Sequence, residues 1–154
     1  MKELKEILFG VNIDSVYGDI NVSISEISFD SRQIKQNSIF IALKGNDLDG
    51  HDYIDQSINK GAKVVVCETF PKKIDEYDIV FIKVQCSKTA LYIISSNFYG
   101  NPSSKIDLIG VTGTNGKTTI TSLLYRLFNN QGIKSGLIST INIEYEGFTE
   151  NSKN

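Results

Sequence analysis

The run LIGVTGTNGKTTITSLL, residues 108–124, constrains the fold of this chain more than any other stretch. A loop that holds a di- or triphosphate needs backbone N–H groups that point inward, and glycines such as Gly113 and Gly116 let the chain curl that closely. The loop is predicted to open into a helix, whose free N–H groups and dipole favour an anion. Lys117 is expected to reach the β- and γ-phosphates, and the Thr118 hydroxyl to ligate Mg²⁺. The run therefore predicts a nucleotide-phosphate loop between a strand and a helix.

One position departs from the common phosphate-loop pattern G-x-x-x-x-G-K-[ST]. That pattern requires glycine at position 111, where this chain has Val111. A Gly/Thr-rich turn without a ligand is the alternative, but Lys-Thr-Thr after a glycine at this place is hard to explain by folding alone. Lys117 is the predicted catalytic residue, and Thr118 the predicted metal ligand. The predicted ATP-binding residues are Gly113, Thr114, Asn115, Gly116, Lys117, Thr118 and Thr119.

Hydrophobic patterning divides the chain into two α/β parts. Short apolar runs predict buried strands over 39–43, 63–67, 79–84, 106–112 and 135–141, and a slipped alternation over 22–29 predicts a strand with a bulge. Helical spacing predicts helices over 2–9, 52–60, 87–98 (capped by Ser87) and 117–131. The cluster YGNPSSK at 99–105 is the best candidate boundary, because Gly, Pro, Asn and Ser favour loops. The predicted domains are 1–98, a linker at 99–105, and the start of a parallel-sheet ATP-binding domain, with its first βαβ unit, over 106–154.

Composition favours a globular protein of the cytoplasm. Hydrophobic residues make up 40% of the 154 residues and charged residues 22%, with a formal net charge of −2. No block of Lys and Arg favours nucleic acid or an anionic membrane. No apolar run approaches the roughly 18 residues that a membrane helix needs. Cys67 and Cys86 lie in apolar runs without CxxC spacing, which favours buried reduced thiols over a disulfide or a metal pair.

Two separated motifs resemble one known family. GVTGTNGKTT, residues 110–119, is similar to the ATP loop of the Mur ligases, the cytoplasmic amide ligases of peptidoglycan precursor synthesis. FDSRQIKQNSIFIALKGNDLDGHDYI, residues 29–54, resembles the N-terminal signature of the same family, with Asn37 where glycine is common. FYGNPSSKIDLIGVTGTNGKTT is most similar to the tripeptide-forming branch. The branch that adds D-Ala-D-Ala usually has Ser-x-Gly-Lys-Thr in the loop, whereas this chain has Thr114-Asn115-Gly116.

The resemblance implies that the first domain binds the UDP end of UDP-MurNAc-L-Ala-D-Glu. The positions that match the family's nucleotide contacts are Phe29, Ser31, Asn46, Asp47 and Leu48. A hydroxyl and a Gly-flanked loop at adjacent strand ends can face one crevice, where open α/β sheets bind ligands. A capped turn with a local salt bridge is the alternative for Asp30-Ser31-Arg32. His51, the only histidine, is expected to serve loop architecture rather than catalysis.

The resemblance also implies a reaction. The γ-phosphate of ATP passes to the D-Glu carboxylate, and the amine of a diamino acid (meso-diaminopimelate or L-lysine) displaces phosphate from the acyl phosphate. ATP and Mg²⁺ are the implied cofactors, and the enzyme is expected to be a monomer. Further family parts are absent from these residues, so the chain is expected to be an N-terminal fragment that does not ligate alone. Three alternatives stay open: the D-Ala-D-Ala-adding ligase, another P-loop ATP-using enzyme, and a UDP-sugar-binding module without catalysis.

Overall fold

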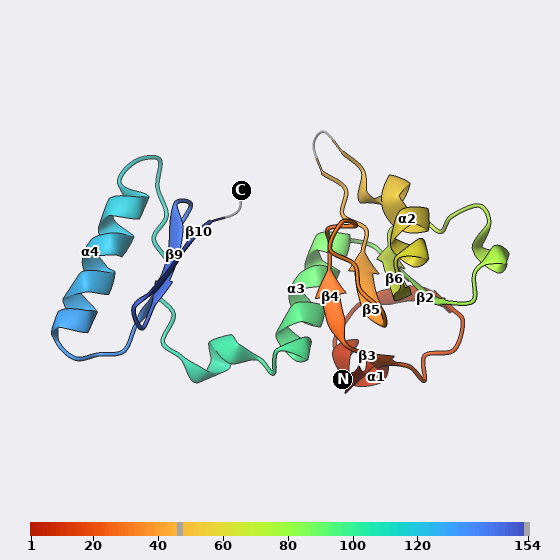
Figure 1. Cartoon of the computed structure of the whole chain (residues 1–154), viewed down its shortest axis with the longest axis horizontal. Helices are drawn as coiled ribbons and strands as arrows, with labels where there is room; N and C mark the ends of the chain where they lie inside the picture. The colour runs from red at the N-terminus through yellow and green to blue at the C-terminus, as the bar shows by residue number, and fades with distance from the viewer. Residues whose placement is uncertain (46–47, 153–154) are drawn as a thin grey trace. The chain divides into compact units, whose positions relative to one another are not determined.

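The structure is a computed structural model that describes residues 1–45 and 48–152. The chain divides into two compact units, Met1–Ile106 and Asp107–Asn154 (Figure 1). The first unit is a mixed α/β domain built on a five-stranded sheet, and the second joins one long helix to a three-stranded sheet. This confirms the predicted α/β class.

The sheet of the first unit has the strand order β2-β7-β6-β5-β4. Strands β4, β5, β6 and β7 are parallel to one another, and β2 pairs antiparallel with β7 as an edge strand. The central strands are buried along nearly their whole length, as expected of parallel strands covered on both faces. The bounds are β2 (Ile13–Tyr17), β4 (Glu26–Ser28), β5 (Ser38–Ile41), β6 (Ala62–Cys67) and β7 (Val80–Val84), which confirm the strands predicted near 39–43, 63–67 and 79–84.

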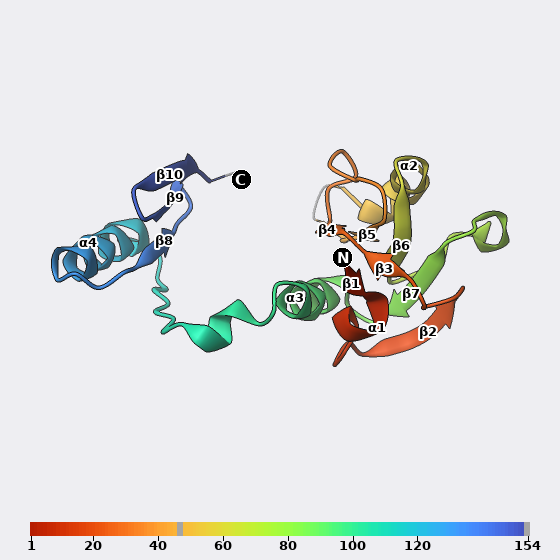
Figure 2. The ribbon, with the colours of Figure 1, turned by 60° about the horizontal axis from the view of Figure 1, so that its bottom comes forward.

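Helices cover both faces of this sheet. Helices α1 (Leu4–Ile7) and α3 (Ser87–Phe98) lie on one face, and α2 (Ile54–Asn59) lies on the other (Figure 2). Alternate residues of β6 divide between the two cores: Val64 and Val66 pack with α1 and α3, while Val65 and Cys67 pack with α2. Short 3-10 turns occupy η1 (Gly50–Tyr53), η2 (Ile74–Glu76) and η3 (Pro102–Lys105).

The N-terminal segments differ from the prediction in three ways. The predicted helix over 2–9 is one turn, α1, preceded by strand β1 (Lys2–Glu3), which pairs with β3 (Ser23–Ile24). The predicted bulged strand over 22–29 is instead two strands that belong to different sheets. The extended structure is interrupted at Ser25, between β3 and β4. Strand β2 lies where the sequence predicted a polar connection, since an edge strand exposed on one face carries little apolar pattern.

The start of α3 also corrects a prediction. The N-cap residue is Cys86, not Ser87, and Ser87 is buried as the first residue of the helix. The Ser87 amide still receives a side-chain partner, because it donates to Glu68 Oε1 at 2.9 Å. A carboxylate from the end of β6 therefore satisfies a free N–H group of the first turn, the role that was predicted for Ser87.

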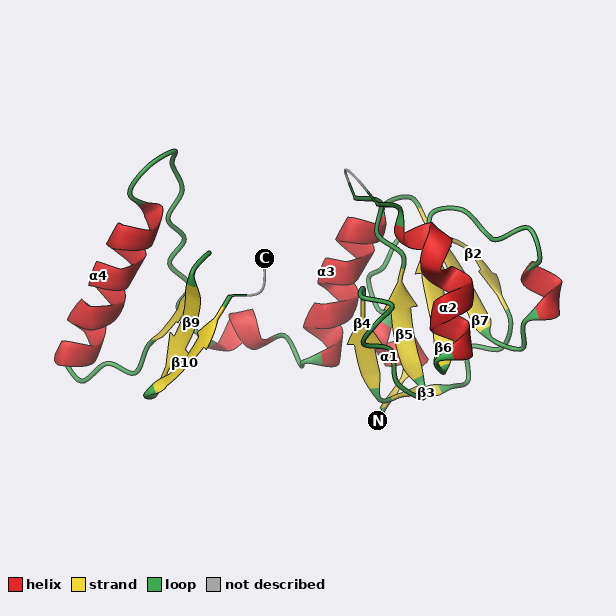
Figure 3. Cartoon of the chain, turned by 45° about the horizontal axis from the view of Figure 1, so that its top comes forward, coloured by secondary structure: helices red, strands yellow, loops and turns green. Residues whose placement is uncertain are grey.

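In the second unit, helix α4 (Lys117–Asn130) confirms the helix predicted over 117–131 (Figure 3). The predicted strand over 106–112 is not formed, because no described residue pairs with it. Three of its apolar side chains, Ile106, Leu108 and Ile109, are exposed. The second predicted strand forms as β8 (Gly136–Ile138), but it pairs antiparallel with β9 (Asn142–Tyr145), which pairs antiparallel with β10 (Phe148–Asn151). The expected parallel βαβ unit is therefore wrong in its first strand and in its sheet.

Candidate functional site

The predicted phosphate loop leads directly into helix α4. Gly116 is the N-cap residue with a φ of 76°, a left-handed conformation that glycine adopts without strain. Gly113 also has a positive φ, 143°, and a Cβ added at either glycine would meet no atom closer than 3.8 Å, so backbone conformation rather than space favours glycine there. The first N–H groups of α4 have no partner within the helix, as at every helix start, so they are free to bind an anion. The residues present therefore fit a phosphate group.

Lys117 lies over this loop. Its ammonium group donates to Gly113 O at 2.5 Å and to Thr114 O at 3.2 Å. The positive charge is thus held beside the helix N-terminus, where it adds to the field that attracts an anion. Thr118 is half-buried next to Lys117, whereas Thr114, Asn115 and Thr119 are exposed. The loop brings together all seven residues predicted for ATP binding in one continuous segment.

The other predicted site belongs to the first unit, at the carboxyl ends of the parallel strands. Asp30 and Arg32 follow the end of β4 and form a tight local pair. The Arg32 guanidinium donates to both Asp30 oxygens, with the closest contacts at 2.9 Å, and the Arg32 amide donates to Asp30 Oδ1 at 2.9 Å. These bonds lower the pKa of the Asp30 carboxyl to about 2. The salt-bridged turn exists, and it fixes the backbone on both sides of Ser31.

Helix α2 holds Ser31 from the other side. The Ser31 hydroxyl donates to Gln56 Oε1 at 3.0 Å, and Lys60 Nζ donates to the Ser31 carbonyl oxygen at 3.0 Å. Gln56 and Lys60 are four residues apart, so a helical turn places them on the same side. Ser31 is only 8% exposed, although it lies in a loop. The serine is therefore placed by contacts with a helix that follows it by more than twenty residues.

His51 connects the loop after β5 with the end of β6. Its Nε2 accepts from the Glu68 amide at 2.9 Å, so the ring proton is on Nδ1, which donates to Asp49 Oδ1 at 2.6 Å. The Asp49 carboxylate also accepts from the His51 amide, and these bonds hold the Asp49 pKa below its usual value. Gly50 between them tolerates no side chain, because a Cβ would lie 2.6 Å from the Leu43 amide. This agrees with the architectural role predicted for His51.

The remaining predicted contacts are less constrained. Phe29 follows β4 and is 60% exposed, and Leu48 is 67% exposed in the loop after β5. Asn46 and Asp47 lie outside the described residues. Phe29, Ser31 and Leu48 thus come from loops that follow the neighbouring parallel strands β4 and β5, and the loop residues of the phosphate site lie in the other unit.

Sequence reasoning missed Gln56, Lys60 and Glu68. Gln56 and Lys60 were assigned only to a helix, and their i, i+4 spacing on its polar side was the available signal. Glu68 follows directly after a buried strand, at the edge where polar residues of parallel sheets gather. Without the fold, nothing in the sequence pairs Gln56 with Ser31, because the contact crosses 25 positions.

The two cysteines have opposite environments. Burial raises the pKa of the Cys67 thiol to about 12. Cys86, predicted to be buried, is instead exposed at the start of α3, where bonds from Thr89 and from backbone N–H groups lower its pKa. Both are free thiols. In the described part of the chain, no three His, Cys, Asp or Glu side chains gather as a metal site, and no helix could cross a membrane.

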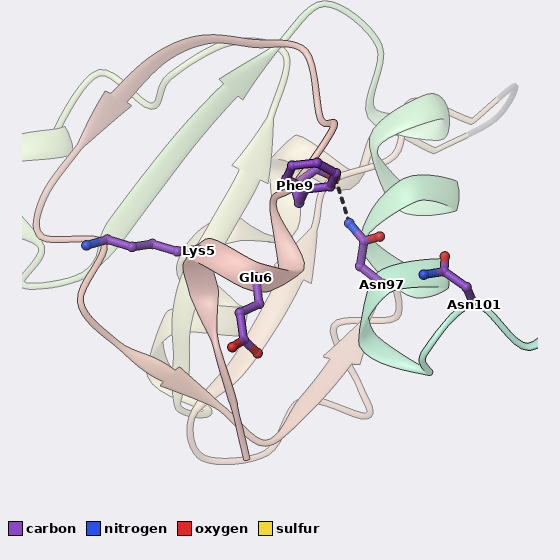
Figure 4. A pocket seen from close by; sticks show the side chains of 5 residues that line it. All are labelled: Lys5, Glu6, Phe9, Asn97 and Asn101. Atoms are coloured by element: carbon purple, nitrogen blue, oxygen red, sulfur yellow. Dashed lines mark hydrogen bonds between the residues drawn. The ribbon is translucent and has the colours of Figure 1, made fainter.

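A separate hollow of about 460 Å³ lies between α1 and the end of α3 (Figure 4). Its lining residues are Lys5, Glu6, Phe9, Asn97 and Asn101. The Asn97 amide group donates to the carbonyl oxygens of Ile7 and Phe9, so it serves the end of α1. Helix α3 begins just after the end of β7 and runs back along the sheet. The hollow therefore lies at the amino ends of the parallel strands, whereas Ser31 lies at their carboxyl ends.

Comparison with known proteins follows the same division of the chain. Residues 23–99 match the family model described as "Mur ligase family, catalytic domain", and residues 111–154 match the "Mur ligase middle domain". The UDP-N-acetylmuramoyl-L-alanyl-D-glutamate–2,6-diaminopimelate ligases of Phocaeicola vulgatus and Cytophaga hutchinsonii are 46% and 48% identical over 139 residues, or 90% of the chain. The chain spans 28% and 29% of the length of these two relatives.

Solved structures of the same family share the fold. The match to MurF from Acinetobacter baumannii covers 92% of this chain and 30% of the MurF chain, with a TM-score of 0.67 and 20% sequence identity. The match to MurF from Thermotoga maritima, solved in complex with ADP, covers 69% of this chain and 23% of the MurF chain, with a TM-score of 0.53 and 30% sequence identity. Since one family model spans half of the chain and a second covers its C-terminal part, the chain belongs to the Mur ligase family.

Proposed function

We propose that this chain supplies the UDP-binding unit and the ATP-phosphate loop of a ligase that adds a diamino acid to UDP-MurNAc-L-Ala-D-Glu. The observation that carries the proposal is the 46–48% identity, over 90% of the chain, to ligases named for diaminopimelate. The MurF structures, at 20% and 30% identity, give less support to the D-Ala-D-Ala-adding alternative. We place the enzyme in the cytoplasm as a monomer that binds neither nucleic acid nor membrane.

In the first unit, the proposed role of Ser31, Phe29 and Leu48 is to bind the UDP part of the substrate, together with Asn46 and Asp47. The salt-bridged turn and the His51 bridge hold two adjacent loops at one edge of the sheet. Such an edge is where open α/β sheets bind nucleotides. Two observations support this role. The turn around Ser31 is short and fixed by hydrogen bonds, and Ser31 itself is buried, which is unusual for a serine in a surface loop.

In the second unit, the proposed role of Gly113 to Thr119 is to bind the phosphates of ATP. Backbone N–H groups and Lys117 offset the negative charge, and the Thr118 hydroxyl is the proposed ligand of Mg²⁺. ATP supplies the phosphoryl group that activates the D-Glu carboxylate for attack by the amine. Lys117 is already held beside the helix N-terminus, so binding a phosphate requires only that it exchange two carbonyl partners for the anion.

These units alone are not expected to complete the reaction. On α4, Ile120, Leu123 and Leu127 are each about half-exposed, between 48% and 59%. A continuous apolar stripe of this kind is normally covered by further structure. The segment 106–112 likewise gains no strand partner among the described residues.

The proposal is tested by phosphate release. An enzyme of the relatives' full length that carries this chain should release phosphate from ATP only when UDP-MurNAc-L-Ala-D-Glu and diaminopimelate are both present, with L-lysine a poorer acceptor. The 154-residue chain alone should release none above background. Turnover dependent on D-Ala-D-Ala and the muramoyl tripeptide would show the alternative ligase to be right and the proposal wrong.

A further inference from the structure

We infer that His51 positions the loop after β5 only while its ring is neutral, so that protonation of this histidine releases the loop and weakens substrate binding. The described stem of this loop comprises residues 43–45 and 48–50. The part of the inference that concerns binding rests on the proposed function, in which Leu48 contacts the substrate. His51 is a positioning residue, because it acts through the loop that it holds.

The ring of His51 supplies a hydrogen-bond acceptor at the end of β6. Pairing between the end of β5 and β6 includes the bond from the Ala42 amide to Val66 O at 2.9 Å. Two residues further along, the Glu68 amide donates to His51 Nε2 at 2.9 Å. The loop after β5 is thereby joined to the central sheet through a lone pair of the ring.

The stem of the loop is tied closely to this ring. Asp49 Oδ1 accepts from both the amide and the Nδ1 atom of His51, at 2.9 and 2.6 Å. Asp49 also forms a β-bridge with Lys44 on the other side of the stem. The Gly50 amide donates to Leu43 O at 2.8 Å, which closes the base of the stem. A shift of the ring therefore shifts the stem.

Protonation removes the lone pair on which the bond to Glu68 depends. Both nitrogens of a protonated imidazole are donors, so Nε2 would direct an N–H group at the Glu68 N–H group. The Asp49 carboxylate favours the protonated ring, but it is two residues away in the same loop and stays beside the ring in both states. The bond to Glu68 exists only while the loop is held. The held loop therefore binds a proton less readily than the released loop, and holding is lost as the pH falls.

The other charged groups around the ring do not reverse this sign. The bonds from His51 and the positive charge of Lys44 hold the pKa of the Asp49 carboxyl below its usual value. Asp49 therefore stays charged across the range in which histidines change charge, about pH 5–8. The Glu68 carboxylate is directed at the first turn of α3, where it accepts a backbone N–H, and the Cys86 thiol near it is exposed.

The first measurement follows the ligand-free chain by ¹⁵N NMR between about pH 8 and pH 5.5. His51 is the only histidine, so its ring signals are assigned without ambiguity. At the higher pH they should report a proton on Nδ1 and a lone pair on Nε2. As the pH falls, the amide signals of Glu68 and Leu48 should move with the midpoint of the ring, while that of Val65 in β6 stays in place. A proton on Nε2 at the higher pH, or Glu68 and Leu48 signals that ignore the ring, would overturn the inference whether or not the substrate binds.

The second measurement is the dissociation constant of UDP-MurNAc-L-Ala-D-Glu at the same two pH values. Its diphosphate is esterified at both ends and keeps its charge throughout this range. The unaltered chain should bind about tenfold more weakly at the lower pH, the ratio expected for one hydrogen bond lost and left unpaired. His51→Gln offers Glu68 an amide oxygen that does not titrate, so its affinity should not change with pH. His51→Leu removes the acceptor and should bind weakly at both pH values.

The outcomes separate the inference from the proposed function. A pH dependence that persists in His51→Gln would belong to another group, and His51→Leu binding as tightly as the unaltered chain would show that the ring positions nothing. Either result would overturn the inference. An absence of binding by the unaltered chain at the higher pH would instead contradict the proposed function, while the ring titration without ligand would still decide whether protonation releases the loop.

Discussion

Replacing Lys117 with alanine is expected to lower ATP turnover by about two to three orders of magnitude, measured in an enzyme of the relatives' length that carries this chain. The expectation follows from the proposed role of Lys117 in offsetting charge on the transferred phosphoryl group. In the structure its ammonium group is held over the loop by Gly113 and Thr114, beside the start of α4. The measurement is the rate of phosphate release at saturating substrates. Binding of UDP-MurNAc-L-Ala-D-Glu should be unaffected, because the proposed substrate contacts belong to the other unit.

Lys134→Ala is the matched control for this variant. Lys134 is also a lysine of the second unit, but its side chain is 88% exposed and pairs with Glu146 at 2.9 Å. An exposed ion pair contributes little, so turnover should remain within about twofold of the unaltered enzyme. Equal losses in both variants would indicate a general effect of charge, and an unchanged rate in Lys117→Ala would contradict the proposed role of Lys117.

Phe81→Ala is expected to destabilise the first unit by about 3–5 kcal/mol, the usual cost of truncating a buried phenylalanine. Phe81 lies in β7, is fully buried, and packs against Phe70 and Tyr77 with ring centroids 6.4 and 5.9 Å away. Domains are typically stable by about 5–15 kcal/mol, so the loss is a large share of the total. The measurement is urea unfolding, followed through the NMR signals of amides in β6.

Phe9→Ala provides the comparison at the surface. Phe9 is 81% exposed, so its truncation removes little buried apolar area and should change the free energy of unfolding by less than about 0.5 kcal/mol. Similar losses in the two variants would mean that the α2 side of the sheet is not the well-packed core that Phe81 indicates.

The parts of the fold that the sequence predicts well are those with a local pattern. Uninterrupted apolar runs identify β5, β6 and β7, and the spacing of Ile120, Leu123 and Leu127 identifies α4. Strand β2 was missed because one of its faces is exposed, and its place in the sheet depends on β7, more than sixty residues away. The predicted strand over 106–112 has the right composition, but a strand forms only where other strands satisfy its backbone.

The candidate sites divide in the same way. The phosphate loop is one continuous segment, so its residues, their order and the helix that follows could all be predicted from the sequence. The environment of Ser31 could not, because Gln56, Lys60 and His51 reach it or its neighbouring loop only after the sheet has formed. The residue types of a site indicate its chemistry, whereas the hydrogen-bond partners of a single side chain such as Ser31 depend on tertiary contacts.

The central claim is that the first unit binds UDP-MurNAc-L-Ala-D-Glu at the carboxyl ends of its parallel strands. The direct measurement is a titration of this compound against the ¹⁵N-labelled chain, followed by amide chemical shifts. Saturable changes should be largest at Ser31, Arg32 and Leu48, with Asn97 and Asn101 at the opposite edge unaffected. An absence of saturable binding, or changes concentrated around Asn97 and Asn101, would contradict the account.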